Sequence, residues 1–367
     1  MPIYPLYALL FADRGLSDGQ ISALLAIWSS VGILAEVPTG VLADHFSRRS
    51  ALVVAGVLQA GGYTLWALAP GFLGFAGGFA LWGLGGALAS GAREALVYDG
   101  LAALGAEDHY ARLSGRIMSA GLLGQLPAAA AATVLYAAGG FALATWVSAG
   151  LCLAAAVLAT RLPEAPRQRD AEDDEPTYLA GLRAGVAVIA RRPGVRHAAL
   201  AVAILNGFDA LDEYFPLIAR DWGVPTGLNP LATLAIPLVG AVGAALGGPA
   251  ARLRSATLAG WLGSGAIILG AASLWRRPGG LAAVAVFYGV YRLVLVVVDA
   301  RLQERITSAS RATVTSVAGL GSEVSAFGLY AAWAWGGIGL VAAVVLGAAF
   351  ALPRLIRRPV SAAAAAR

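Results

Sequence analysis

Long apolar segments separated by short polar breaks recur along the whole chain. A run of about 18 or more apolar residues is long enough to form a helix that crosses a lipid bilayer. On this basis the pattern predicts twelve spans, at residues 1–12, 19–43, 50–69, 71–99, 111–137, 139–160, 195–219, 227–248, 255–275, 279–303, 312–332 and 335–353. We therefore expect an all-α membrane protein that crosses the bilayer many times.

The first predicted span is shorter than the others. Only about 12 residues precede Asp13, whereas a membrane crossing needs about 20. No positively charged leader and no A-x-A cleavage site occur near the start, which argues against a signal peptide. We expect that part of this first span is missing from the sequence.

The longest polar stretch divides the spans into two sets of six. Residues 161–177 mix charges of both signs with proline, which predicts a flexible linker, and residues 178–193 are amphipathic, which predicts a short helix along the membrane surface. The expected organisation is a six-helix bundle at 1–160, a linker with a surface helix at 161–194, a second six-helix bundle at 195–353 and a tail at 354–367.

Composition supports a membrane protein and argues against a nucleic-acid-binding one. The chain is 59% hydrophobic and 13% charged, whereas soluble domains carry about a quarter charged residues. The net charge of +5 comes from arginines, and the absence of lysine favours a GC-rich bacterial genome. Twenty arginines fall in the loops and tail on one side of the predicted spans and four on the other. The positive-inside rule then places both termini in the cytoplasm.

A charged cluster occupies the short gap between the second and third spans. It runs from Gly40 to Leu52 with the sequence G-V-L-A-D-H-F-S-R-R-S-A-L. This cluster resembles the loop 2–3 signature of the major facilitator superfamily, G-x-L-A-D-[RK]-x-G-[RK]-[RK]-x-x-L. Two positions depart from the signature, because His45 stands where Arg or Lys is usual and Ser47 where Gly is usual.

The resemblance implies a transporter with two six-helix bundles related by a pseudo-two-fold axis. It also implies that the signature residues, with an acidic residue on span 4, form a cytoplasmic gate. On this chain those positions are Gly40, Asp44, Arg48, Arg49 and Asp99. The alternative is that these residues only fix the topology of the loop.

A weak internal repeat agrees with this architecture. Aligning Asp99 with Asp299 places Arg93 of span 4 within one position of Arg292 of span 10. The signature itself survives in the second half only as a trace at residues 247–252. Related halves are expected in transporters of this kind.

Besides Asp99, the candidates for buried charges in predicted spans of the first half are Glu36, Arg93 and Glu94. An ionisable group at mid-bilayer costs at least about 2.5 kcal/mol, so each one needs a partner or a function. Glu36 precedes Pro38, which frees a backbone carbonyl. We favour pairing of Glu36 with a basic neighbour or this opened backbone over proton coupling. Arg93 and Glu94 either form ion pairs with other spans or contact a substrate.

The second half carries a denser set of charges. In an α-helix Asp209, Asp212 and Glu213 would share one face, which suits either proton binding or an acidic patch that caps the span. Arg292 and Glu323 fall on spans that are neighbours in similar facilitators. We expect them to form a buried ion pair, which becomes a coupling element if a substrate or proton competes for one partner.

Span 5 contains a degenerate form of an element found in drug/proton antiporters. The segment 121–127 reads G-L-L-G-Q-L-P, whereas the antiporter element is G-x-x-x-G-P-x-x-G-G. Gln125 could offer a hydrogen bond in a cavity. Close helix packing by small residues is the simpler use of this segment.

Several kinds of site are missing from the sequence. There is no G-x-x-x-x-G-K-[ST] loop, which argues against direct use of ATP. No spacing of metal ligands and no catalytic arrangement of Ser, His or Cys is present, so we expect neither a cofactor nor an enzyme. Cys152 is the only cysteine.

We therefore predict a monomeric secondary transporter of the bacterial inner membrane that works by alternating access. The favoured activity is proton-coupled efflux of amphiphilic small molecules, driven by the proton gradient. Its partners would be the lipid bilayer, the substrate and protons, with no nucleic acid. The alternatives are uptake of a nutrient by symport or uniport and, more distantly, a membrane sensor or scaffold.

Overall fold

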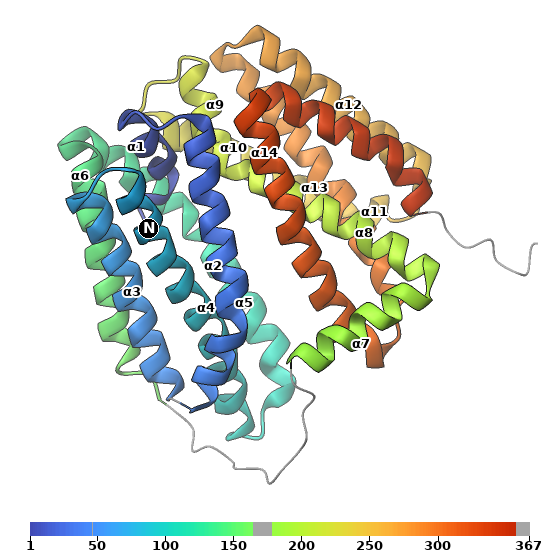
Figure 1. Cartoon of the computed structure of the whole chain (residues 1–367), viewed down its shortest axis with the longest axis horizontal. Coiled ribbons are helices and arrows are strands. Elements are labelled where there is room, and N and C mark those ends of the chain that lie inside the picture. The colour runs from blue at the N-terminus through green and yellow to red at the C-terminus, as the bar shows by residue number, and fades with distance from the viewer. Residues whose placement is uncertain (46, 164–177, 357–367) are drawn as a thin grey trace, which may run out of the picture. The chain divides into compact units, whose positions relative to one another are not determined.

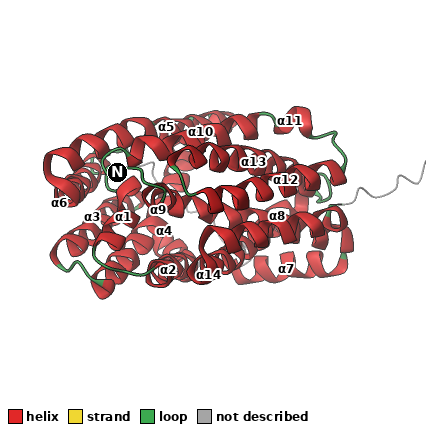
Figure 2. Cartoon of the chain, turned by 90° about the horizontal axis from the view of Figure 1, so that it is seen from above, coloured by secondary structure: helices red, strands yellow, loops and turns green. Residues whose placement is uncertain are grey.

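The computed structural model describes residues 1–45, 47–163 and 178–356, without the side chains of 36–45, 111, 122, 178–182, 308, 309 and 312. Within these ranges every regular element is a helix (Figure 2). The described residues form two compact units. The first unit draws on Met1–Asp174 and Pro225–Leu231, and the second on Glu175–Val224 and Ala232–Arg367.

The first unit is a bundle in which α3 packs against both α4 and α6, and α2 packs against α4 (Figure 1). Its elements are the short helix η1 (Tyr4–Leu6), α1 (Tyr7–Asp13), α2 (Asp18–His45), α3 (Arg48–Leu68), α4 (Phe72–Ala102), η2 (Glu107–His109), α5 (Tyr110–Leu123) and α6 (Gln125–Ala159).

Close approach of α3 and α4 depends on small residues. A Cβ atom on Gly62 would lie 2.7 Å from the carbonyl oxygen of Gly78 on the facing helix. Near this contact the indole Nε1 of Trp66 donates a hydrogen bond to the carbonyl of Phe75 at 3.1 Å. Small residues at such positions let helix backbones meet, which favours helix association in membranes.

The second unit is built around α14, which packs against α7, α8 and α12. Its elements are α7 (Tyr178–Arg191), α8 (Pro193–Gly207), the 3₁₀ helix η3 (Phe208–Tyr214), α9 (Phe215–Asp221), α10 (Asn229–Ala245, whose first turn belongs to the first unit), α11 (Gly247–Ala250), α12 (Ser255–Trp275), η4 (Pro278–Gly280), α13 (Leu281–Gln303) and α14 (Ser308–Leu355).

Two glycines divide the longest helical stretches into separate segments. Gly140 in α6 has φ 62° and ψ −157°, and Gly337 in α14 has φ 56° and ψ −152°. Only glycine adopts this backbone region readily, so each glycine ends one helix and begins another. The ribbon of α14 in Figure 1 accordingly has two legs.

Seven helical stretches of the described chain are long and apolar enough to cross a membrane. Two of them, Glu107–Ala159 and Thr313–Leu355, contain the glycine breaks and cover four of the predicted spans. The remaining predicted spans correspond to α1, to the α8–η3–α9 segment and to the shorter apolar helix α10. The break in α14 lies at Gly337, a few residues later than predicted.

A helix, α7, covers most of the segment predicted to lie along the membrane surface, and its place at the membrane stays a prediction. It packs against α14, where a Cβ atom on Gly185 would lie 2.5 Å from the carbonyl oxygen of Thr313. Residues 164–177 of the predicted linker and residues 357–367 of the predicted tail fall outside the described residues.

The backbone at Gly337 supplies a first prediction. Gly337→Ala should destabilise the protein by about 1–3 kcal/mol, because an alanine is strained in this region although no other atom lies within 4 Å of its Cβ. The matched control is Gly328→Ala in the same helix, which has equally open space and helical backbone and should leave stability unchanged or raise it. The measurement is the thermal unfolding midpoint in lipid nanodiscs, and equal midpoints for the two variants would contradict the argument.

Candidate functional site

The signature loop is organised by a helix cap. Ser47 precedes α3, and its hydroxyl accepts a hydrogen bond from the backbone N–H of Ser50 at 3.1 Å. Serine is a favoured residue at this position because it satisfies a free N–H at the helix start. Ser47, which stands where the signature usually has glycine, therefore adds a side-chain N-cap to α3.

The first residue of α3 contacts the end of α4. The Nε atom of Arg48 lies 3.7 Å from Oδ2 of Asp99, and the two side chains are 17% and 44% exposed. The structure thus brings together two of the predicted gate residues. Arg49 is exposed, whereas Gly40 and Asp44 have their backbone in α2 and their side chains outside the described set. The gating role itself stays a prediction.

Span 7 is interrupted at its centre. Pro216 has no N–H, so it cannot donate the α-helical bond to the carbonyl of Asp212. The N–H of Phe215 donates to that carbonyl instead, which is a 3₁₀ bond. The chain therefore passes from α8 through η3 to α9. The prediction of a single helix across residues 195–219 is wrong.

The interruption changes where the three carboxylates point. A 3₁₀ helix has about three residues per turn, so Asp209 and Asp212 stay aligned and Glu213 turns away. Asp212 is exposed and Asp209 half-buried, whereas Glu213 is only 8% exposed. The prediction that all three share one face is wrong for Glu213.

Asp209 is the centre of a polar cluster between η3 and α13. The Nη1 atom of Arg292 lies 2.8 and 2.9 Å from its two carboxylate oxygens, and the hydroxyl of Tyr288 donates to it at 2.8 Å. The side chains of Arg292 and Asp209 remain 32% and 44% exposed. The cluster is therefore a charge-assisted network that is only partly buried within the second unit.

Three residues on one face of α13 hold the interrupted span. Tyr288, Tyr291 and Arg292 are spaced i, i+3 and i+4, so their side chains lie together. The hydroxyl of Tyr291 donates to the carbonyl of Leu205 at 2.8 Å, close to the point where α8 ends. This bond adds a partner for a carbonyl at the helix break.

Glycines of α10 make room for this face of α13. A Cβ atom on Gly240 would lie 2.6 Å from the ring of Tyr288 and 3.3 Å from Cγ of Arg292. At Gly243 a Cβ atom would collide with the backbone of Gly289. The polar cluster therefore depends on the absence of side chains at both glycines of α10.

The structure gives Arg292 a different partner from the one expected. Arg292 pairs with Asp209, whereas Glu323 on α14 is exposed. Sequence reasoning placed Asp209 on span 7 and Arg292 on span 10 without linking them. It also missed Tyr288 and Tyr291, although their spacing from Arg292 was a usable signal.

The other candidate residues belong to the first unit. Arg93, Glu94 and Gln125 are exposed, on α4 and at the start of α6. Glu36 lies in α2, and its side chain is outside the described set. Span 5 is divided at Gly124 into α5 and the start of α6.

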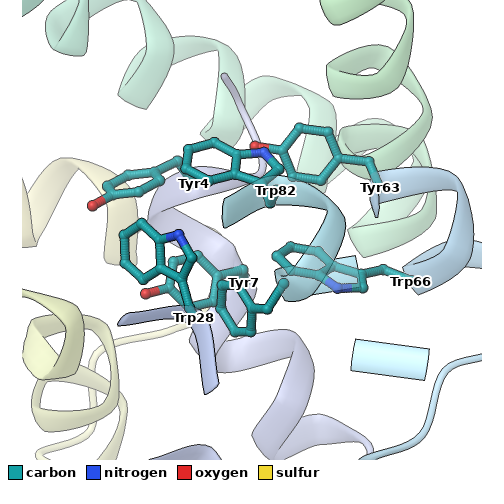
Figure 3. A pocket seen from close by; sticks show the side chains of 7 residues that line it. Tyr4, Tyr7, Trp28, Tyr63, Trp66 and Trp82 are labelled. Atoms are coloured by element: carbon teal, nitrogen blue, oxygen red, sulfur yellow. The ribbon is translucent and has the colours of Figure 1, made fainter. Parts of the chain in front are cut away.

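The first unit contains an aromatic pocket (Figure 3). Its seven lining residues come from η1 and the first four helices and are Tyr4, Tyr7, Trp28, Tyr63, Trp66, Phe79 and Trp82. Trp28 stacks on Phe79 with ring centroids 5.7 Å apart and an interplanar angle of 16°. The cavity volume is about 10 Å³, which is room for about one water molecule. In this conformation the pocket is an aromatic core with a small opening.

No group of three or more His, Cys, Asp and Glu side chains among the described residues is placed to hold a metal ion. The polar cluster at Asp209 can instead exchange a proton or a hydrogen-bonded ligand, because a carboxylate beside a guanidinium changes its interactions on protonation. Its place within a membrane-spanning unit makes it the main candidate site.

Solved transporter structures resemble the whole chain. A D-xylose-proton symporter matches with a TM-score of 0.68 and 17% identity, over 97% of this chain and 93% of that one. The nucleoside transporter NupG matches with a TM-score of 0.71 and 14% identity, over 97% and 95%. A bacterial homologue of the human lysosomal transporter Spinster, inward-facing and unoccupied, matches with a TM-score of 0.70 and 17% identity, over 97% and 88%. No curated protein shows significant sequence similarity to the chain.

The helices, the spans and these likenesses define a multi-pass membrane protein with a transporter fold. The sequence model of the Major Facilitator Superfamily matches residues 1–343. The chain belongs to the major facilitator superfamily, and the predicted all-α fold class is confirmed.

The ion pair at the centre of the cluster should be energetically coupled. We test this with a double-mutant cycle of Asp209→Asn and Arg292→Gln. We expect the destabilisation of the double variant to be smaller than the sum of the two single destabilisations by about 0.5–3 kcal/mol, because each single change leaves a charge unpaired in the membrane. The control cycle uses Arg220 and Asp221, an exposed pair at 2.9 Å, for which we expect less than about 1 kcal/mol. Reversible unfolding in detergent gives both values, and a coupling at Asp209 no larger than the control would contradict the argument.

Proposed function

We propose that this protein is a secondary transporter that exports amphiphilic small molecules in exchange for protons by alternating access. The observation that carries the proposal is the cluster of Asp209, Tyr288 and Arg292 at the interruption of span 7. Transporters of this architecture bind substrate and coupling ion near discontinuous helices. The arginine bias of the loops supports cytoplasmic termini, and the proposed location is the bacterial inner membrane.

Proton coupling follows from the chemistry of this cluster. Asp209 is an acceptor for both Arg292 and Tyr288, so protonation of its carboxylate weakens both contacts. Asp212 lies one 3₁₀ turn away and is exposed, which offers a second carboxylate to the released guanidinium. Protonation of Asp209 can thereby change the hydrogen-bond partners of Arg292 and Tyr288. Proton binding would then be coupled to the conformation of span 7.

Fewer observations support the proposed direction of transport. The segment 121–127 is a degenerate antiporter element, and it contains the glycine and proline at which α5 passes into α6. Trp28 and Tyr4 offer partly exposed aromatic faces for an apolar or cationic group. Uptake by proton symport is the second candidate, because a D-xylose-proton symporter shares the fold.

Proton exchange can be measured in energised inverted vesicles with a pH-sensitive dye inside. Adding cationic dyes and antibiotics should release internal protons, and Asp209→Asn should lower this release by about tenfold or more, because a protonatable group is lost. The matched control is Asp221→Asn, an exposed carboxylate near the end of the same span, which should keep wild-type release.

A folded protein that releases no protons with any of these compounds would overturn the export proposal. A panel of sugars and nucleosides in the opposite orientation then tests symport. Release that survives Asp209→Asn would assign coupling to another residue.

The contact of Arg48 with Asp99 should control the conformational equilibrium more than stability. We expect Asp99→Asn to slow transport at least about fivefold while the free energy of unfolding changes by less than about 1 kcal/mol, because the pair is partly exposed. Combining Arg48→Asp with Asp99→Arg should restore part of the rate. The control is Asp108→Asn in η2, and a charge swap no faster than the single variants would show that the contact is not a gate.

A further inference from the structure

In each unit a side-chain contact joins the start of one long helix to the end of the next, namely α3 to α4 in the first unit and α12 to α13 in the second. The arginine of the contact comes from the first of the two helices in one unit and from the second in the other. In the first unit the loop supplies the arginine, because Arg48 at the start of α3 contacts Asp99 near the end of α4. The corresponding loop of the second unit, 246–254, has no acidic residue, and its Arg252 and Arg254 are exposed.

In the second unit the arginine comes from the fourth helix. Arg301 near the end of α13 donates from Nη1 to the hydroxyl of Ser255 at 3.0 Å and from Nη2 to the backbone carbonyl of Leu253. The hydroxyl of Ser255 in turn donates to the carbonyl of Ile356 at 3.1 Å, just past the end of α14. Arg301 and Ser255 together thereby connect α13, the start of α12 and the end of α14.

Asp299, which aligns with Asp99, has not kept the role of its counterpart. Within the described ranges no ion pair involves Asp299. The link lies two residues further along α13, at Arg301, and the Ser255 hydroxyl and Leu253 carbonyl that it contacts are neutral acceptors. No charged partner on the loop is therefore needed, which explains why only a trace of the signature remains there.

The two links differ in how easily they break. Arg301 is 3% exposed, so a broken link leaves a buried guanidinium without these acceptors, which is costly. Asp99 is 44% exposed and lies 3.7 Å from the Nε atom of Arg48, so water and salt ions can compete for its carboxylate.

We propose that Arg301 is a positioning residue that locks the ends of α12, α13 and α14 together, as a fixed counterpart of the breakable Arg48–Asp99 contact. Conformational change at these loop ends then occurs in the first unit, while the second unit moves as one body. This functional meaning rests on the proposed alternating access, whereas the lock itself can be tested without any substrate.

Hydrogen–deuterium exchange of the full chain in nanodiscs tests the lock. Arg301→Gln should speed exchange in peptides covering 247–258 and 350–356 by about tenfold, because the backbone there loses its tie to α13. Arg301→Lys should fall between this variant and the wild type. The controls Arg254→Gln, an exposed arginine of the same loop, and Asp99→Asn should leave both peptides unchanged.

Salt distinguishes the lock from a merely structural side chain. Raising salt from about 50 to 500 mM should speed exchange more at 47–54, where the contact is an ion pair, than at 247–258, where the Ser255 hydroxyl and the Leu253 carbonyl are neutral acceptors. If Arg301→Gln does not fold, Ser255→Ala removes one acceptor of Arg301 and the donor to Ile356, so it should speed exchange at 350–356 at least as much and at 247–258 to a smaller extent.

The lock is overturned if a folded Arg301→Gln or Ser255→Ala variant exchanges at wild-type rates in both segments. It is also overturned if salt loosens 247–258 as much as 47–54. A negative transport assay leaves these exchange results unaffected, so the lock and the proposed transport function are tested independently.

Discussion

Hydrocarbon offers no hydrogen-bond partners, so every broken helix and every charge inside this bundle must be satisfied by the protein itself. The second unit shows how one break is accommodated. Pro216 removes a backbone donor, Phe215 supplies a 3₁₀ bond to the carbonyl of Asp212, and Tyr291 adds a donor to the carbonyl of Leu205. The break thus requires polar groups on α13, and those groups also hold the carboxylate of Asp209.

The polar cluster depends equally on residues that contribute no side chain. Arg292 and Tyr288 are large, and they fit between η3 and α10 because Gly240 and Gly243 leave space on α10. A membrane helix with larger residues at these positions would push α13 away and separate Arg292 from Asp209. Electrostatics and packing are therefore one constraint at this site, and the glycines belong to it as much as the charged residues do.

The sequence predicted the spans well because their signal is strong and local. The length of apolar runs, the pairing of glycines and amphipathic spacing are properties of neighbouring residues. The glycine pair located the break at Gly140, and amphipathic spacing located the helix seen as α7. Partners across the fold were harder to predict. Arg292 could pair with any carboxylate at its depth, and periodicity alone could not favour Asp209 over Glu323.

The failure at span 7 has a specific physical cause. Pro216 was visible in the sequence, but proline inside an apolar run is compatible with a kinked α-helix as well as with a 3₁₀ segment. Packing decides between them, since a Cβ atom on Gly207 would collide with Ser325 of α14 at the point where α8 ends. That contact lies more than 100 residues away in the chain and leaves no local signal.

The glycine turns at Gly140 and Gly337 occupy corresponding places in the two halves of the chain. Gly140 follows Asp99 by 41 residues and Gly337 follows Asp299 by 38, so the second half is three residues shorter here. Seven residues separate α4 from α5 and four separate α13 from α14, which accounts for the difference. The two halves therefore differ in length within a loop, while the distance from the helix after that loop to its glycine turn agrees within one residue. Backbone geometry relates the two halves more closely than their side chains do.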